Sequence, residues 1–303
     1  MKTLNRKKHR GSKGEFIFYL ALIALPIIQV LIFYFYVNFN SIMMAFQSYD
    51  GYGDYVFDSN PWANFSEIGA NMPTIWVALK NSLVVWIFTA VLGTFLALVF
   101  SYYIYKGWIL SKTFKFFLFL PSVLPSILLV LVFKFFVNEA IPGYTEALTG
   151  SAPEFTLLQN SFLPTVIFYN VWICFGTQLL INTGAMSQIP PEIIEAGKVD
   201  GVSTIREFFS IVLPMILPTI STFLIASVAT IFTNQANIYA FIGDGAEVAD
   251  YTIGYYLFIL VESDLHGGPD QYTYASALGI VCTLIAFPLT LGVRRLLEGK
   301  GDE

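Results

Sequence analysis

Apolar residues gather in six long runs along the chain, each near twenty residues. The runs lie at 16–37, 82–105, 116–137, 161–182, about 215–242 and about 273–293. A helix of about 20 residues crosses the hydrocarbon core of a bilayer. The pattern therefore predicts an all-α, polytopic membrane protein with six transmembrane helices, whose transmembrane domain extends over 16–293.

The first run follows a basic segment, as the apolar part of a signal peptide would. It is too long for such a segment, and no clear small-residue cleavage site follows it. We therefore expect a retained span.

A seventh apolar stretch, 251–261, has only eleven residues. As a helix it would reach about 16 Å, which is too short to cross a membrane. Asp250 and Glu262 flank it. We expect an interfacial or re-entrant helix on the outer side, which either packs against the bundle or gates its outer mouth.

Basic and acidic residues divide between the two sets of loops. Fourteen of the sixteen Lys and Arg residues fall in the tail 1–15, in alternate loops and in the tail 294–303. The opposite loops hold Lys80 and thirteen acidic residues. The positive-inside rule then predicts that both termini and the loop 183–213 are cytoplasmic. Charged residues make up 12% of the chain, against about 25% in soluble domains, and no nucleic-acid partner is expected.

The chain offers few residues for metal or catalytic chemistry. Cys174 and Cys282 both lie in apolar runs, and we expect no disulfide. His9 and His266 are far apart and suggest no metal site. No Ser/His/Asp, HExxH or paired-carboxylate pattern is present, which argues against a membrane enzyme.

The loop 183–213 has the pattern of two short helices joined by a turn. Pro191 suits the first turn of a helix, and Lys198 favours its C-terminal end. Asp200 and Gly201 then form a strong turn signal.

A capping box from Thr204 to Glu207 is predicted to open the second helix, which leads into the fifth run. By pattern alone, the loop is either a docking element below the membrane or an amphipathic segment on the lipid headgroups.

This loop resembles the E-A-A motif of ABC importer permeases, in which Glu-Ala-Ala is followed by Asp-Gly-Ala and later by Ile-x-Leu-Pro. The residues that carry the resemblance are Glu195, Ala196, Gly197, Asp200, Gly201, Val202, Ile211, Leu213 and Pro214. Gly197 and Val202 stand where the motif has alanine.

The rest of the chain is most similar to the sugar-type permeases, the group that includes maltose and glycerol-phosphate importers. The similar stretches are 76–104, 117–144, 251–258 and 272–287. Gly-Asp-Gly at 243–245 stands where many members have Gly-Gly-Pro.

The resemblance implies a type I ABC importer permease fold in a bacterial or archaeal cytoplasmic membrane. It also implies a second homologous permease subunit, two cytoplasmic ATPase subunits coupled through the loop, and an extracytoplasmic solute-binding protein. ATP and Mg would then bind the ATPase partner, and this chain would hold no cofactor. The implied solute is a carbohydrate or related polyol.

The energy source can also be argued from the residues. No G-x-x-x-x-G-K-[ST] sequence is present, so this chain has no loop to hold ATP phosphates. No Asp or Glu lies within the predicted spans, so an ion-coupled carrier would lack a carboxylate relay. Lys134 is the one charge there, and it either snorkels to the interface or contacts the pore or a partner.

Polar residues in two spans are candidates for a solute path. Those of the fifth run recur at 3-4-3 spacing, which predicts a single helical face: Ser227, Thr230, Asn234 and Asn237. The fourth run adds Asn170, Gln178 and Asn182, with Tyr169 and Trp172 as possible stacking surfaces. These residues either bond between helices or line a path for a hydroxyl-rich solute. An amino acid, a peptide or an anion stays open as the solute, and an ion-coupled carrier stays open as a different class.

Overall fold

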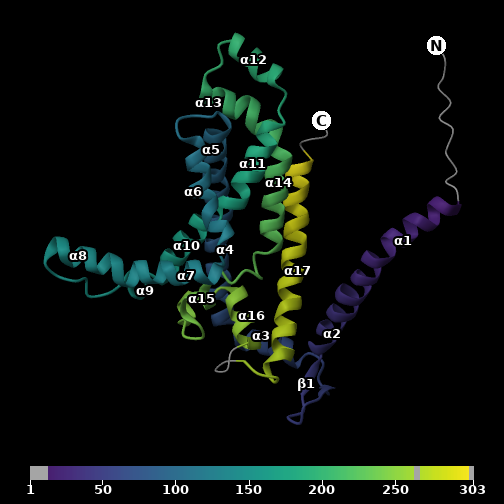
Figure 1. Ribbon diagram of the computed structural model, residues 1–303. Helices are drawn as coiled ribbons and strands as arrows, with labels where there is room; N and C mark the ends of the chain where they lie inside the picture. The colour runs from purple at the N-terminus through teal and green to yellow at the C-terminus, as the bar shows by residue number, and fades with distance from the viewer. Residues whose placement is uncertain (1–12, 263–266, 300–303) are drawn as a thin grey trace.

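The protein is an elongated bundle of helices with one small β-hairpin. The computed structural model describes residues 13–262 and 267–299 of the chain, and Figure 1 shows how its elements are arranged. Within these ranges, six helices are long and apolar enough to cross a membrane: Ile17–Met44, Met72–Tyr105, Ser126–Thr149, Phe162–Ser187, Thr204–Ala229 and Gln271–Glu298. The predicted fold class, all-α with six membrane-spanning helices, is confirmed.

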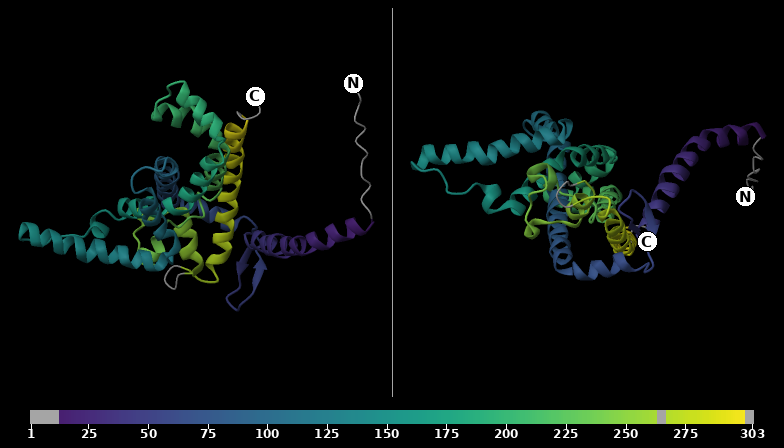
Figure 2. Two further views of the ribbon diagram at one scale, coloured as in Figure 1. Left: turned by 45° about the horizontal axis from the view of Figure 1, so that its top comes forward. Right: turned by 90° about the horizontal axis from the view of Figure 1, so that it is seen from below.

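Most of the first span stands apart from the bundle, as Figures 1 and 2 show, and only its C-terminal part lies against the sixth span. The segments of the first span are α1 (Lys13–Gln29), the π-helical η1 (Val30–Tyr36) and α2 (Val37–Met44). No residue of its most apolar window is buried. An antiparallel hairpin follows, with strands β1 (Gln47–Tyr49) and β2 (Tyr55–Phe57).

Four further spans form the packed bundle. The second span follows α3 (Ala63–Ala70) and consists of α4 (Met72–Trp86), the π-helical η2 (Ile87–Leu92) and α5 (Gly93–Tyr105). The fourth consists of α10 (Phe162–Ile173) and α11 (Phe175–Ser187). The fifth consists of α13 (Thr204–Glu207), the π-helical η4 (Phe208–Val212) and α14 (Leu213–Ala229). The sixth is α17 (Gln271–Glu298).

The region between the second and fourth spans departs from the predicted helix at 116–137. There, α6 (Ser111–Val123) ends before Leu124, and α7 (Ser126–Phe135) begins after Pro125. Proline has no amide hydrogen and restricts the preceding residue to extended backbone. Leu124 accordingly has φ −82° and ψ 146°. The prediction of one unbroken span at 116–137 is therefore wrong.

Beyond this break, the chain forms an arm that projects from the bundle (Figures 1 and 2). The arm consists of η3 (Phe136–Ala140) and α8 (Ile141–Thr149), which continue α7, and α9 (Leu157–Asn160) follows it. The helix α7 itself packs into the bundle through Leu129, Val130 and Phe133. Glu139 and Glu146 lie beyond the predicted span at 116–137 but on the observed helix, because that helix extends to Thr149. Both side chains are exposed, and neither forms a buried ion relay.

Two large hydrophobic clusters and a small one around Ala97 and Val171 hold the described part of the bundle together. The largest joins the second, fourth and sixth spans to α16 (Ile253–Glu262), and Tyr169, Tyr255 and Tyr274 are fully buried in it. The second large cluster includes Leu98, Met186, Ile194, Phe208 and Val212. Because lipid is as apolar as these side chains, close packing rather than exclusion of water stabilises such contacts between spans.

The two ends of the bundle carry different elements. One end holds α12 (Pro191–Val199) and the C-terminal end of α17, and the other holds the hairpin, α3 and α16 (Figure 1). Shorter elements of the loop after the fifth span are α15 (Ile238–Ile242) and the 3-10 turn η5 (Val248–Asp250). The assignment of the α12 end to the cytoplasm stays a prediction from charge.

Candidate functional site: a polar cavity and a loop at one end of the bundle

A cavity of about 150 Å³ lies between the second, fourth and fifth spans and the segment 249–262, which is predicted to lie on the outer side and is called the outer segment below. Four of the predicted path residues line it: Gln178, Ser227, Thr230 and Asn234. They reach it from two different parts of the fold, because Gln178 lies on α11 and the others lie at or beyond the end of α14. The structure thus brings these four residues together.

The predicted polar face on one helix is nevertheless wrong. The helix α14 ends at Ala229, and Thr230 already has φ −101°. Asn234 turns the chain, since its side-chain Oδ1 accepts a 2.8 Å hydrogen bond from the amide of Ala236. Ala236 and Asn237 then take positive φ angles of 54° and 60°. The fifth span is therefore shorter than 215–242 predicts, and a compact loop supplies part of the cavity wall.

Asn170 and Asn237 hold this loop to the fourth span. The side-chain amide of Asn237 donates to Asn170 Oδ1 at 2.7 Å. Asn170 Nδ2 donates in turn to the carbonyl oxygens of Ala236 and Val166, both at 2.8 Å. These two predicted path residues lie outside the lining of the cavity in this structure and act as a brace for it.

Trp172 also lies outside the cavity lining. Its ring is stacked near Phe133, with centroids 6.3 Å apart. The aromatic ring in the cavity is Trp86, which the sequence interpretation did not select. Its indole Nε1 donates to Ser227 Oγ at 3.1 Å.

Other lining residues on the second span were missed as well. Ser82, Trp86 and Thr89 recur at i, i+4 and i+7, so they share one face of the helix. This spacing was the signal that could have found them. Ser82 Oγ also accepts a 2.9 Å hydrogen bond from the amide of Ile253, which fixes the start of α16 beside the cavity.

Two buried amides near the cavity are unsatisfied among the described residues. Gln178 Oε1 has no hydrogen-bond partner, and neither side-chain polar atom of Asn182 has one. Asn182 is 1% exposed and follows Gln178 by one helical turn. A buried polar group without a partner costs about 1–3 kcal/mol. A polar occupant of the cavity would remove that cost for Gln178.

The outer segment is bound firmly to the second span. Asn81 Nδ2 donates to the carbonyl oxygens of Ala249 and Tyr251, at 2.7 and 2.9 Å. A side chain on Gly254 would meet the backbone of Asn234 at 2.5 Å, so this glycine allows α16 to touch the cavity loop. Burial raises the pKa of the Asp250 carboxyl at the edge of this segment, and the charge of Glu247 adds to the effect. The expected short helix is present and packs against the bundle, and its gating role stays a prediction.

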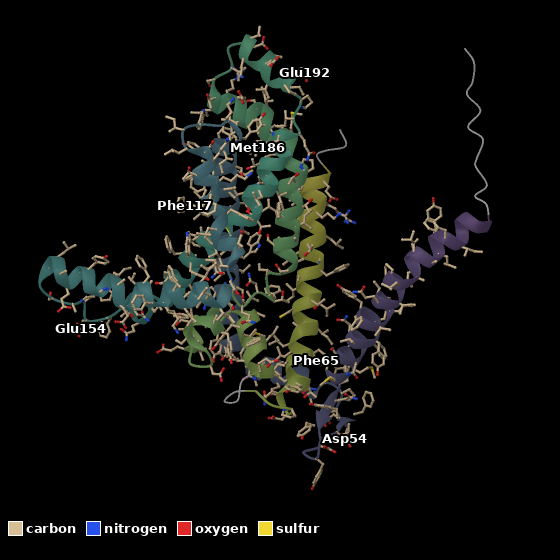
Figure 3. All side chains as sticks on the ribbon, viewed as in Figure 1. Asp54, Phe65, Phe117, Glu154, Met186 and Glu192 are labelled. Carbon is tan, nitrogen blue, oxygen red and sulfur yellow. The ribbon has the colours of Figure 1, made fainter. Side chains whose placement is uncertain are left out.

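At the opposite end, α12 has the predicted form. Pro191 is its first residue, and Glu192 lies in its first turn. Figure 3 shows Glu192 at the tip of the molecule and Met186 below it in the bundle. The helix ends in a Schellman motif, because Val202 N donates to Gly197 O at 2.9 Å and Gly201 N donates to Lys198 O at 3.1 Å. Gly201 has φ +71°, the left-handed conformation that the turn requires.

One side of α12 packs against the bundle and the other faces outward. Ile194 and Gly197 are buried, and a Cβ on Gly197 would meet Ile211 Cδ1 at 2.8 Å. Glu195, Ala196 and Asp200 are exposed. Ile211 and Leu213 are half-buried, and Pro214 is exposed, on the helix that follows the loop. The motif residues therefore divide into a set that seats α12 and a set that faces outward.

The second helix of the loop begins differently from the prediction. Its N-cap is Ser203, whose Oγ accepts from the amide of Arg206 at 3.4 Å, so the capping box from Thr204 to Glu207 is wrong. Glu207 turns inward and is 4% exposed. It forms an ion pair with Lys106 at the end of the second span, with Lys106 Nζ 2.8 Å from Glu207 Oε1. The fold, not local sequence, brings these two charges together.

Some sequence predictions fall beyond these sites. His9 and His266 lie outside the described residues. Cys174 and Cys282 are free cysteines. No group of three or more His, Cys, Asp or Glu side chains arranged to hold a metal ion occurs in 13–262 or 267–299.

Comparison with known proteins gives a consistent family match. The profile of the family described as "Binding-protein-dependent transport system inner membrane component" matches residues 89–299. The multiple sugar-binding transport system permease protein of Streptococcus mutans is 27% identical over 285 residues, which cover 91% of each chain. The maltose/maltodextrin transport system permease protein of Salmonella typhimurium is 25% identical over 76% of this chain, which corresponds to 39% of that protein.

Solved structures share the fold. A subunit of a bacterial ABC transporter involved in the import of the acidic polysaccharide alginate has a TM-score of 0.78 at 20% identity, with 94% of this chain and 96% of that chain covered. In a second structure, the bacterial alginate transporter is in complex with an alginate pentasaccharide-bound periplasmic protein. Its TM-score is 0.73 at 21% identity, with 93% of each chain covered.

Proposed function

The chain belongs to the family of binding-protein-dependent transport system inner membrane components, and we propose that it forms half of the translocation path of an ATP-driven carbohydrate importer. It is a multi-pass membrane transport component and not an enzyme. The proposed solute is a mono- or oligosaccharide or a related polyol, delivered by an extracytoplasmic binding protein.

The cavity between the second and fifth spans carries the proposal for the solute. Its wall combines the indole of Trp86 with hydroxyl groups and with the unpaired carbonyl of Gln178. A carbohydrate presents hydroxyl groups at its edges and apolar C–H groups on its faces, so it needs both kinds of contact. No Lys, Arg, Asp or Glu among the described residues lines the cavity, which disfavours a charged solute. The names of the relatives, which refer to sugars and maltose, support the same class.

The exposed side of α12 supports the proposal for the energy source. Glu195 and Ala196 face outward, and Val199 at the end of α12 is 87% exposed. Ile205 on the neighbouring α13 is 73% exposed. An apolar and acidic surface at the end of the bundle fits a protein partner. We assign it to one of two cytoplasmic ATPase subunits, which would bind ATP and Mg. A second, homologous permease would complete the path, and the α12 end would be cytoplasmic.

Transport by the reconstituted complex tests this function. Vesicles would contain this chain, the second permease and the ATPase, with the solute-binding protein added outside. We expect uptake of a carbohydrate that the binding protein recognises, dependent on ATP inside the vesicle. Uptake that needs an ion gradient and no ATPase would replace the proposal with an ion-coupled carrier. Uptake of amino acids or peptides alone would reject the carbohydrate.

A further inference from the structure

We propose that Lys106 and Glu207 are positioning residues that make the second and fifth spans move as one body. A displacement of α12 would then be transmitted along both spans to the wall of the cavity. This inference rests on the proposed function, because it assumes that α12 receives the movement of an ATPase. It concerns residues outside the E-A-A motif and outside the cavity.

The contact between Lys106 and Glu207 is short and largely shielded from water. Lys106 Nζ lies 2.8 Å from Glu207 Oε1 and 3.1 Å from Oε2, so both carboxylate oxygens are engaged. The exposed fractions of the two side chains are 17% and 5%. The hydroxyl of Tyr102 lies 3.1 Å from Glu207 Oε1, and Lys106 Nζ lies 5.8 Å from the centre of the Tyr102 ring. The side chains of Lys106 and Tyr102 therefore both contact the Glu207 carboxylate.

A second contact joins the same two spans at the cavity. Trp86 Nε1 donates to Ser227 Oγ at 3.1 Å. Trp86 precedes Lys106 by about 20 residues and Ser227 follows Glu207 by about 20 residues, so each contact is about 30 Å from the other along both helices. The helices run in opposite directions (Figure 1), so the ion pair joins the two spans at one end, and the Trp86–Ser227 contact joins the far end of the fifth span to the middle of the second.

The loop is attached directly to this joined pair of spans. Ile194 of α12 packs in the same hydrophobic cluster as Leu98 and Tyr102 of the second span and Phe208 of the fifth. A push on α12 therefore acts on the end that carries the ion pair. If the ion pair holds, the two spans tilt together and the distance across the cavity wall at Trp86 and Ser227 is kept. If it fails, the fifth span can move alone.

The test measures carbohydrate uptake and ATP hydrolysis in vesicles that contain the whole importer. The variants are Lys106→Met and Glu207→Gln, which remove one charge each, and Lys106→Arg, which keeps the charge. The matched control is Glu298→Gln, which removes the charge from the exposed Arg294–Glu298 pair. Membrane abundance and co-purification of the ATPase are measured on the same preparations.

We expect Lys106→Met and Glu207→Gln to lower the amount of solute imported per ATP by about tenfold, since removal of one partner leaves a buried charge that must move to find water. ATP hydrolysis should continue, and Lys106→Arg and Glu298→Gln should keep the wild-type ratio. Tyr102→Phe, which keeps both charges, should give a smaller loss of the same kind.

Three results would overturn the inference. The first is a wild-type ratio of solute to ATP in both charge-removing variants. The second is an equal fall in solute imported per ATP in Lys106→Arg and Lys106→Met, which would show that the positive charge of Lys106 has no role. The third is loss of the protein from the membrane together with a normal ratio in Tyr102→Phe, which would make the ion pair a folding contact only. Failure of the wild-type complex to import any carbohydrate would instead reject the proposed function.

Discussion

Asn237 Nδ2 donates a 2.7 Å hydrogen bond to Asn170 Oδ1 and so fixes the loop after the fifth span against the fourth span. Asn237 holds a positive φ of 60°, a conformation that asparagine tolerates better than most residues. The pair supports the cavity wall without lining it, because it holds the loop between Thr230 and Asn237, which contains the lining residue Asn234.

Asn170→Leu should destabilise the protein by about 2–3 kcal/mol. It removes three hydrogen bonds and leaves the amide of Asn237 and the carbonyl of Ala236 with fewer partners. The measurement is thermal unfolding of the detergent-solubilised protein. Asn160→Ala, at an exposed position, is the control and should leave the midpoint unchanged. Equal midpoints for Asn170→Leu and wild type would show that the brace contributes little.

Gln178→Leu should raise the solute concentration for half-maximal uptake by roughly tenfold, which corresponds to about 1.4 kcal/mol for a lost hydrogen bond to solute. Gln178 lines the cavity, and its Oε1 accepts no hydrogen bond from any described residue. This oxygen is therefore available to accept one from the solute. The control is Thr177→Ala, the adjacent exposed residue on α11. An unchanged half-saturation concentration, measured on the assembled importer, would place the solute elsewhere.

Gly201→Asp should reach the membrane in normal amount and should bind the ATPase weakly. A side chain at Gly201 would meet no atom within 4 Å, so the cost comes from the left-handed backbone, about 1–2 kcal/mol, and from the partner surface. Glu195→Lys should give a milder loss, because it reverses a charge on the exposed side of the helix without straining the turn.

The matched control for this variant is Gly150→Asp. Gly150 also has a positive φ, +80°, and open space around it, but it lies at the end of α8, away from α12. It should retain ATPase co-purification and uptake. Full uptake by Gly201→Asp would mean that α12 does not couple to the ATPase, and loss of Gly201→Asp from the membrane would mean that the turn is needed for folding.

Cysteine labelling should confirm the orientation of the bundle. In a chain with Cys174 and Cys282 replaced, Ser111→Cys and Ser203→Cys should be shielded from an impermeant thiol reagent in intact cells. Ser59→Cys and Ser151→Cys should react, because their loops hold the acidic residues. Reaction of Ser203→Cys from outside would reverse the orientation and remove α12 from the cytoplasm.

The parts of this fold that depend on local chemistry could be predicted from the sequence. Apolar runs near twenty residues identified six spans, and Pro191 with Gly201 identified both ends of α12. The short outer helix was also predictable, since eleven apolar residues are too few to cross. Pro125 even carried the signal for the break after α6, although the apolar pattern alone favoured a continuous helix.

Other features depend on contacts between distant segments. No proline or glycine stops the fifth span at Ala229; the chain turns there because Asn234, Asn170 and α16 hold the loop. Glu207 looked like a capping residue, since the sequence does not show that Lys106 and Tyr102 lie beside it. The cavity residues were found in part, because a polar residue in a span shows a need for a partner but not which partner it has.

The largely uncovered surface of the first span has a consequence for how the protein is made. In water, an uncovered helix such as α1 would drive aggregation, but lipid chains solvate its side chains as well as another helix would. The helix also satisfies its own backbone hydrogen bonds while it stands alone. Each copy can therefore be synthesised and inserted by itself. Assembly with other subunits can then follow by diffusion in the plane of the bilayer.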